Sequence, residues 1–302
     1  MVTEMKVLNF GSLNYDYVYL VKHMVQLGET ISSSGMETHF GGKGLNQSIA
    51  LAKAGADVYH AGMVGEDGED LIAVCKKYGV HTDYITRRPG KSGHAVIQIT
   101  PEGENCIILY SGANGENTEE KINEVLAGFE EGDLVLLQNE MNLLDLIVEK
   151  AYDRKMKIVL NPSPMNEKIL NCDLKKISLF LLNEVEGEQL TGETEAACIL
   201  NRMRELYPNA EVVLTLGKEG SVYAGPRMNC ACGSFSVEAV DTTAAGDTFT
   251  GYYIASVLRG KSIEESLKTA SAASGIAVTR KGAVPSIPDA EEVEDFIKKY
   301  SR

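Results

Sequence analysis

The run VDTTAAGDTFTGYYIASVL at residues 240–258 combines small side chains, a carboxylate and an apolar pattern. Three small residues (244–246) precede Asp247, and apolar residues at helical spacing follow it, which predicts a loop that opens into a helix. The first N–H groups of a helix lack intrahelical partners and carry partial positive charge. We therefore expect the 244–247 amides to form an anion hole for a phosphate.

Asp247 would repel that phosphate unless it has a chemical task. Accepting the proton of a hydroxyl group that attacks the phosphate is such a task, so Asp247 is the candidate general base. Asp is also a favoured N-cap residue, and spacing alone leaves a purely structural capping role open.

A second constellation, HFGGKGLNQSIALAKAG, occupies residues 39–55. Its glycines permit close approach of the backbone, while Lys43, Asn46 and Gln47 supply the mixed donors and acceptors that a polyol needs. It is not a Walker A loop, because no Gly lies five residues before Gly42 and no Ser or Thr follows Lys43.

Two further segments follow predicted strands. Asn183 and Glu186 could position hydrated Mg²⁺ and phosphate oxygens, although a turn with an acidic residue in the first helical turn fits equally well. The segment TLGKEGS at 215–221 suits a hairpin or a loop that covers a nucleotide, and taken alone it favours the hairpin.

Short apolar runs read as buried strands that position these groups. The runs lie at 6–12, 57–65, 133–138, 157–161, 178–183 and 211–217. Segments with helical spacing lie between them, so we expect a Rossmann-like α/β fold, a parallel sheet with helices on both faces. Ligands of such sheets bind beyond the carboxyl ends of the strands, where Asn14, Asp16, Asn139, Glu140 and Asn161 also fall.

Residues 14–40 and 90–111 break the alternation of strand and helix. The second stretch reads as two strands joined by a PEGEN turn. No linker and no repeat divides the chain, so we expect residues 1–302 to form one α/β domain into which these two segments are inserted as a small β-sheet lid.

The composition restricts the partners. A formal net charge of −14 disfavours nucleic acid and anionic membranes, and no window approaches a membrane span. The start MVTEMKVLNF lacks a signal peptide, which predicts a cytoplasmic protein with six reduced cysteines. The five histidines show no paired metal spacing, and no GxSxG motif appears.

In this order, the motifs resemble the ribokinase-like, or phosphofructokinase-B, family of carbohydrate and nucleoside kinases, over nearly the whole chain. The segments that carry the resemblance are NYD at 14–16, FGGKGLNQ at 40–47, QNE at 138–140, LNPSP at 160–164, NEVE at 183–186, TLGKEG at 215–220, DTTAAGD at 241–247 and AVTRKGAVPSIP at 277–288.

The resemblance implies ATP-dependent phosphorylation of a small sugar, with Asp247 as base. The residues implied to hold the sugar are Asn14, Asp16, Gly42, Lys43, Asn46, Ala95, Ile97 and Glu140. Those implied to contact ATP and Mg²⁺ are Asn183, Glu186, Thr215, Gly217, Gly220, Ala244, Ala245, Gly246 and, at the adenine, Ser271. Those implied to surround an activating K⁺ are Asp241, Thr243, Ala277, Arg280, Gly282 and Ser286.

Within the family, Asn14, Asp16 and Lys43 together favour conversion of D-ribose to D-ribose 5-phosphate. Kinases for 2-deoxyribose, fructose, ketodeoxygluconate or a nucleoside remain alternatives, because one hydroxyl group is discriminated by geometry rather than by motif. A catalytically idle sugar-binding regulator is a non-enzyme alternative, although a binder needs no base. The exposed edges of a lid made of strands favour a homodimer that pairs through the lid.

Overall fold

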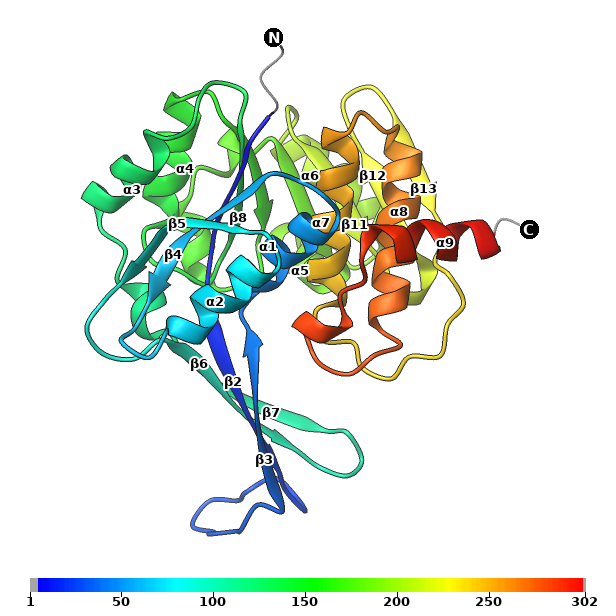
Figure 1. Ribbon diagram of the computed structural model, residues 1–302. Helices are drawn as coiled ribbons and strands as arrows, with labels where there is room; N and C mark the ends of the chain where they lie inside the picture. Colours follow the sequence, from blue (N-terminus) through cyan, green and yellow to red (C-terminus); the bar gives the residue numbers. More distant parts are fainter. Residues whose placement is uncertain (1–4, 301–302) are drawn as a thin grey trace.

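The computed structural model describes residues 5–300, and its framework is a nine-stranded sheet with helices on both faces (Figure 1). The strand order is β13-β12-β11-β10-β9-β8-β1-β4-β5. The parallel strands are β1 (Val7–Phe10), β4 (Val58–Val64), β5 (His81–Arg87), β8 (Leu134–Gln138), β9 (Lys157–Asn161), β10 (Leu179–Asn183) and β11 (Glu211–Thr215). β12 (Ser221–Ala224) extends one edge antiparallel to β11, and β13 (Asn229–Cys232) pairs antiparallel with β12.

Two hydrophobic cores lie on the two faces of this sheet. One core packs beneath α1 (Lys43–Lys53), α2 (Glu69–Lys77), α7 (Ala245–Leu258), α8 (Ile263–Ala277) and α9 (Ala290–Tyr300). The other packs beneath α3 (Glu119–Leu126), α4 (Leu144–Asp153), α5 (Glu184–Thr191) and α6 (Ala196–Leu206). Successive strand residues point to opposite faces, so Val7 enters the first core and Leu8 the second. The α/β fold predicted from the apolar runs is confirmed.

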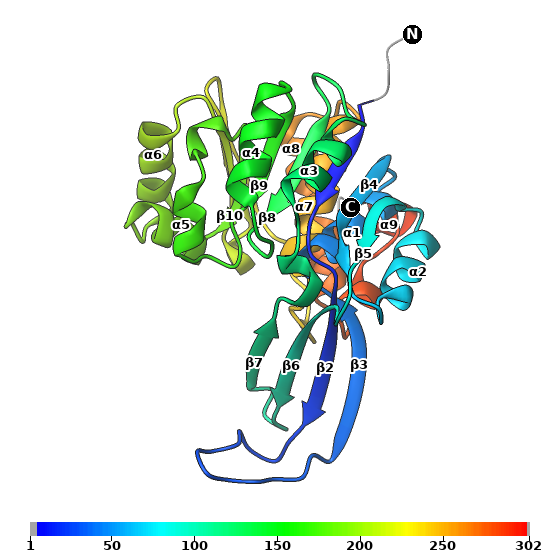
Figure 2. The ribbon, with the colours of Figure 1, turned by 90° about the vertical axis from the view of Figure 1, so that its left-hand side faces the viewer.

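A second, four-stranded sheet projects from the body (Figure 2). Its order is β3-β2-β6-β7, formed by β2 (Asn14–Leu20), β3 (Gly35–Gly41), β6 (Gly93–Ile99) and β7 (Asn105–Tyr110). These strands come from the two segments that break the alternation of strand and helix, which confirms the expected small sheet.

The small sheet stands at the carboxyl ends of the parallel strands. Strand β1 ends at Phe10, and the chain enters β2 at Asn14 only four residues later, so the base of the small sheet lies against that edge. Short 3-10 turns complete the connections, at Gly112–Gly115, Glu167–Asn171, Leu174–Lys176, Gly217–Glu219 and Val284–Ser286. None of the helices between residues 5 and 300 is long and apolar enough to cross a membrane.

Candidate active site

Asp247 lies in the first turn of α7, at the carboxyl edge of the large sheet. The N-cap of this helix is Ala244, whose left-handed φ of 58° turns the chain into the helix, and no side chain caps it. The Asp247 carboxylate therefore does not serve as the cap, and the alternative that the sequence left open is wrong.

Two amides from α1 hold the Asp247 carboxylate. Asn46 donates from Nδ2 to Oδ2 at 3.0 Å, and Gln47 donates from Nε2 to Oδ1 at 2.8 Å. The Asn46 Oδ1 atom is buried and accepts no hydrogen bond within the described part of the chain. Because buried polar atoms are normally paired, this oxygen is available to a ligand hydroxyl beside the carboxylate.

The start of α7 offers free N–H groups. Ala245 donates to the Thr242 carbonyl at 3.2 Å, whereas the N–H groups of Ala244, Gly246 and Asp247 find no acceptor among residues 5–300. Helix polarity makes such donors suitable for an anion. Position 245 is thus already partly used, and the expected anion hole has its free donors at 244, 246 and 247.

A cavity of about 220 Å³ gathers the expected catalytic and nucleotide residues. Its lining includes Lys43, Asn161, Asn183, Glu186, Thr215, Ala244, Ala245, Gly246 and Asp247. These residues come from the ends of three strands, β9, β10 and β11, and from the starts of α1, α5 and α7. The fold therefore brings together groups that are far apart in sequence, such as Lys43 and Asp247.

Lys43 is the cation of this cavity. Burial alone would lower the pKa of its ammonium, but Asp247, Glu140 and Glu186 outweigh burial, and the pKa is raised. Lys43 therefore stays charged among three carboxylates, where it can also face a phosphate.

Glu140 is partly buried beside Lys43, two residues after the end of β8. Burial raises the pKa of its carboxyl, and Lys43 opposes the rise only in part. Its Oε2 accepts the backbone N–H of Lys43 at 3.0 Å and the hydroxyl of Ser12. These contacts tie β8, the β1–β2 connection and the start of α1 at one point.

Asp16 faces the same region from β2. Burial, with a further contribution from Glu140, raises the pKa of Asp16 to about 6. Gly41 lies opposite, and a Cβ there would collide with the Asp16 carboxylate, so only Gly leaves room for it. Asp16 is in register with Ala95, and Val18 with Ile97, so Ala95 and Ile97 share the face of the small sheet that carries Asp16.

A second cavity, of about 320 Å³, adjoins this group. Asn14, Glu140, Asn139 and the end of β7 line it, and Asn139 donates to the Pro164 carbonyl at 2.7 Å. Glu140 thus lines one cavity while its partner Lys43 lines the other, so the two form neighbouring parts of one site.

Asn183 and Glu186 form a capping box at the start of α5. The Asn183 Oδ1 atom accepts from the Glu186 N–H at 2.9 Å, and Glu186 Oε2 accepts from the Asn183 N–H at 3.0 Å. The structural alternative is therefore what the structure shows. Both side chains nevertheless line the cavity beside Asp247, so one role does not exclude the other.

The segment 215–221 is a β-hairpin between β11 and β12, as the sequence favoured. Gly217 and Gly220 both have positive φ, and Gly220 packs against the backbone of Cys232 and Gly233. Ser271 is buried in α8. Of the residues expected to contact ATP, Gly217, Gly220 and Ser271 lie outside the lining of the 220 Å³ cavity, whereas Thr215 belongs to it.

Asp241 joins the two loops that were expected to surround K⁺. Its carboxylate accepts the N–H of Thr243 at 2.9 Å, the hydroxyl of Thr243 at 2.6 Å and the N–H of Gly282 at 2.8 Å. Burial raises the pKa of Asp241, but these hydrogen bonds and Lys281 outweigh burial and lower it. The Val278 carbonyl also accepts from the N–H groups of Val240 and Asp241.

The other expected residues of that region are spread over the second loop. Ala277 and Ser286 are buried, and Arg280 pairs with Glu292. Over residues 5–300, no group of three or more His, Cys, Asp or Glu side chains is arranged to hold a metal ion. A cation between these loops would therefore depend on backbone carbonyls and Asp241.

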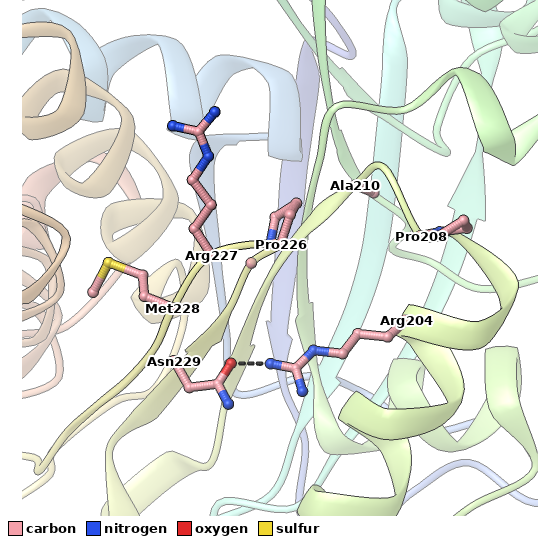
Figure 3. Close-up of a pocket in the computed structure, with 8 residues that line it drawn as sticks. Arg204, Pro208, Ala210, Pro226, Arg227, Met228 and Asn229 are labelled. Carbon is pink, nitrogen blue, oxygen red and sulfur yellow. Dashed lines mark hydrogen bonds between the residues drawn. The ribbon is translucent and has the colours of Figure 1, made fainter.

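None of these residues lines a larger cavity, of about 440 Å³, whose lining is drawn in Figure 3. It is lined by the end of α6, the turn between β12 and β13, and Ala210, which precedes β11. Because β11 ends at the active-site edge, this cavity lies at the opposite edge of the sheet. Its lining contains Arg204 and Arg227 but no carboxylate, so it offers no base.

Sequence reasoning missed Ser12, Asn9 and the buried role of Gln138. Asn9 and Gln138 are fully buried polar residues inside strands β1 and β8, whose other members are apolar. A polar residue in a strand buried on both faces is a signal that could have found them, since such a group needs a partner.

Comparison with known proteins identifies the family of this chain. The model of the family described as "pfkB family carbohydrate kinase" matches residues 5–290. The chain belongs to the pfkB family of carbohydrate kinases. The family resemblance carried by the motifs is therefore confirmed.

The sequence similarity to relatives within the pfkB family extends over nearly the whole length of both chains. The chain is 34% identical to the ribokinase of Haemophilus influenzae, covering 95% of this chain and 97% of that protein. It is 32% identical to the Bacillus subtilis ribokinase with the same coverage. The structure of Arabidopsis thaliana ribokinase complexed with ribose and ATP superposes with a TM-score of 0.86 at 30% identity, covering 98% of this chain and 99% of that one.

Proposed function

We propose that the protein transfers the γ-phosphoryl group of ATP to the 5-hydroxyl of D-ribose, with Asp247 as general base. The observation that carries this proposal is the Asp247 carboxylate itself. It is held in place by Asn46 and Gln47 and lies beside the unpaired N–H groups of residues 244, 246 and 247. A base next to an anion site is what transfer to a hydroxyl group requires.

The sugar would lie between the small sheet and α1. Its 5-hydroxyl faces Asp247 and a neighbouring hydroxyl donates to the free Asn46 Oδ1 atom. The remaining polar partners are Asn14, Asp16, Glu140, Lys43 and the backbone of Gly42, while Ala95 and Ile97 cover the carbon face. The relatives named ribokinase, and the neighbour solved with ribose and ATP, support ribose as the acceptor.

The phosphates of ATP would occupy the 220 Å³ cavity, over the start of α7. Lys43 and the free N–H groups of residues 244, 246 and 247 stabilise the charge that develops on the transferred group. Asn183, Thr215, Gly217, Gly220 and Ser271 would hold the nucleotide from the hairpin and α8. Closure of the small sheet, built from residues 14–40 and 90–111 of this single kinase domain, excludes water from the reaction.

Two cations fit the residues present. Mg²⁺ would arrive with the ATP phosphates, and Glu186, a carboxylate in the cavity wall, would help to place it. K⁺ suits the all-oxygen donors between the loops: the ionised Asp241, Thr243, Ser286 and the carbonyls of residues 277–282, including Ala277, Arg280 and Gly282. When bound there, K⁺ supplies charge that fixes both loops and so preorganises the neighbouring anion hole.

Leaving out K⁺ at constant ionic strength should lower kcat by at least about tenfold. The effect is smaller than the roughly 100-fold or greater loss expected when a donor of an anion hole is removed, because K⁺ acts only through the loops. The measurement is steady-state ADP release in Na⁺ and in K⁺ buffers. An identical rate in both would mean that Asp241 and its neighbours are purely structural.

Lowering the pH should weaken ribose binding through Asp16. Its pKa is raised to about 6, so the carboxyl gains a proton as the pH falls through 6, whereas acceptance of sugar hydroxyls requires the ionised form. Between pH 7 and pH 5 the affinity should fall about tenfold. Calorimetric titration at both pH values measures this. The variant Asp16→Asn should bind weakly at both, and a wild-type affinity that does not change would contradict the role.

We also propose that two copies pair through the small sheet in the cytoplasm. All six residues of the edge strand β7 are exposed, and Ile107, Ile108, Leu109 and Tyr110 are each more than half exposed. Ile107 and Leu109 share the sugar-facing side with Ile97 and Ala95. An exposed apolar edge strand is normally covered. A monomer in light scattering would contradict the dimer.

A panel of acceptors tests the reaction class and the substrate together. Ribose, 2-deoxyribose, fructose, ketodeoxygluconate and a nucleoside are each offered with ATP, Mg²⁺ and K⁺, and ADP release is measured. Ribose should give the highest kcat/KM. Turnover of a nucleoside alone would overturn the ribose assignment, and binding of ribose without turnover of any acceptor would favour the regulator.

A further inference from the structure

We propose that Asn9, Gln138 and Gln47 form a relay of buried amides that fixes the orientation of the Asp247 carboxylate. Gln47 and Gln138 are then positioning residues for phosphoryl transfer, although Gln138 lies one side chain away from the base. The inference rests on the proposed function, because it takes Asp247 as the base.

The relay begins at the Gly44 carbonyl, a group that can only accept hydrogen bonds. Asn9 donates from Nδ2 to the Gly44 carbonyl at 2.7 Å, so its Oδ1 atom must face the other way, toward Gln138. Gln138 then donates from Nε2 to Asn9 Oδ1 at 2.9 Å and to Gln47 Oε1 at 2.7 Å. Because the Gln47 oxygen is held there, its Nε2 atom is directed at Asp247 Oδ1.

A second anchor fixes Gln47 from the opposite side. Asn161 donates from Nδ2 to the Leu181 carbonyl at 2.9 Å, again an acceptor only, so its Oδ1 atom is turned toward Gln47. Gln47 Nε2 donates to that oxygen at 3.2 Å as well as to Asp247. Both ends of the Gln47 amide are therefore specified by backbone carbonyls, and the amide cannot flip without unpairing buried groups.

Asn46 differs from Gln47 in this respect. Its Nδ2 atom donates to Asp247, but its Oδ1 atom has no partner within residues 5–300, so only that one hydrogen bond opposes turning of the Asn46 amide when a ligand enters. Gln47 is thus the fixed support of the base and Asn46 the adaptable one.

Gln138 has an unpaired buried oxygen atom, an unfavourable feature that is consistent with a functional role. It is fully buried, and its Oε1 atom has no partner within the described residues. An unpaired buried oxygen is unfavourable, and an apolar side chain of the same length would avoid it. The donor side of Gln138, which serves Asn9 and Gln47 at once, is the feature that the site uses.

A side branch of the same network leads away from the base. Asn9 Nδ2 also donates to Ser48 Oγ at 2.8 Å, so the Ser48 hydroxyl donates to His60 Nδ1 at 2.8 Å, and His60 Nε2 donates to the Gly11 carbonyl at 3.2 Å. Burial lowers the pKa of His60 to about 4, which agrees with a neutral ring. Ser48 is therefore a matched control: equally buried and in the same network, but off the path to Asp247.

A double-mutant cycle tests the relay. We expect Gln47→Met to lower kcat about 10- to 100-fold, since a small misplacement of a reacting group is enough for such a loss, while the KM values for sugar and ATP stay within about twofold. Gln138→Met should lower kcat about 3- to 10-fold. In the Gln47→Met background, Gln138→Met should have no further effect on kcat, because its influence passes through Gln47.

Ser48→Ala should lower the unfolding temperature and leave kcat within about twofold. If Gln138→Met does not fold, Gln138→Leu takes its place in the cycle. Additive losses of kcat in the double variant, or an equal loss of kcat in Ser48→Ala, would overturn the relay. The wild-type rate tests the proposed function separately: if the acceptor turned over is not ribose, the same cycle is measured with that acceptor.

Discussion

Replacing Asp247 by Asn should lower kcat by about 1,000- to 10,000-fold and leave ribose affinity nearly unchanged. General-base catalysis contributes up to roughly 10,000-fold, and the amide of Asn cannot accept the proton. The variant should fold, because its Oδ1 atom can still accept from Gln47. The free Oδ1 atom of Asn46 has two lone pairs, so it can accept from the new Nδ2 group and still accept from the sugar hydroxyl.

Kinetics and calorimetry on the same preparation check this prediction. Asp145→Asn, an exposed carboxylate in the first turn of α4, is the matched control and should keep full activity. Activity in Asp247→Asn within tenfold of wild type would remove Asp247 from the role of base. A loss of ribose binding would instead assign it to the substrate.

Replacing Lys43 by Met should lower kcat/KM by about 100- to 1,000-fold. Lys43 is the cation among Glu140, Asp247 and Glu186, and it faces the cavity assigned to the phosphates. Removal of one preorganised electrostatic partner of the transition state costs about 3–4 kcal/mol. A neutral side chain also leaves three carboxylates to repel an anionic substrate.

The pH profile of this variant gives a second measurement. Lys43 is the first of the groups that oppose the raised pKa of Glu140, so without Lys43 that pKa should rise further. Glu140 then gains its proton at higher pH, and the acidic limb of kcat/KM should move upward. Lys121→Met removes a surface ion pair with Glu124 on α3. This control variant should change neither kcat/KM nor the pH of its acidic limb. If Lys43→Met kept full activity and the acidic limb of its kcat/KM profile did not shift, the role of Lys43 would be contradicted.

Local sequence pattern was sufficient for the framework. The inner parallel strands β1, β4, β8, β9, β10 and β11 are short apolar runs, because a strand buried on both faces needs no polar side. The parallel edge strand β5, HTDYITR, lacks this pattern and was not predicted. The PEGEN turn predicted the β6–β7 hairpin. The helix start at 244–247 was also visible, since small residues followed by helical spacing are a local signal.

The arrangement around Asp247 could not be predicted in the same way. Its two hydrogen-bond partners lie about 200 residues earlier in the chain, and the positive φ of Ala244 is not typical of that residue type. The pairing of Ser12 with Glu140 depends likewise on which strands are neighbours. Asn183 and Glu186 are the exception, since an N-cap residue followed three positions later by Glu is a recognisable capping box.

The central claim is tested most directly by the identity of the product. Wild-type protein is incubated with ribose, ATP, Mg²⁺ and K⁺, and the mixture is followed by proton-coupled phosphorus NMR. A single phosphomonoester coupled to the two C5 protons of ribose, formed one for one with ADP, is the result that the base at Asp247 predicts. Phosphate on another hydroxyl group, or ADP formed without any sugar phosphate, would contradict it.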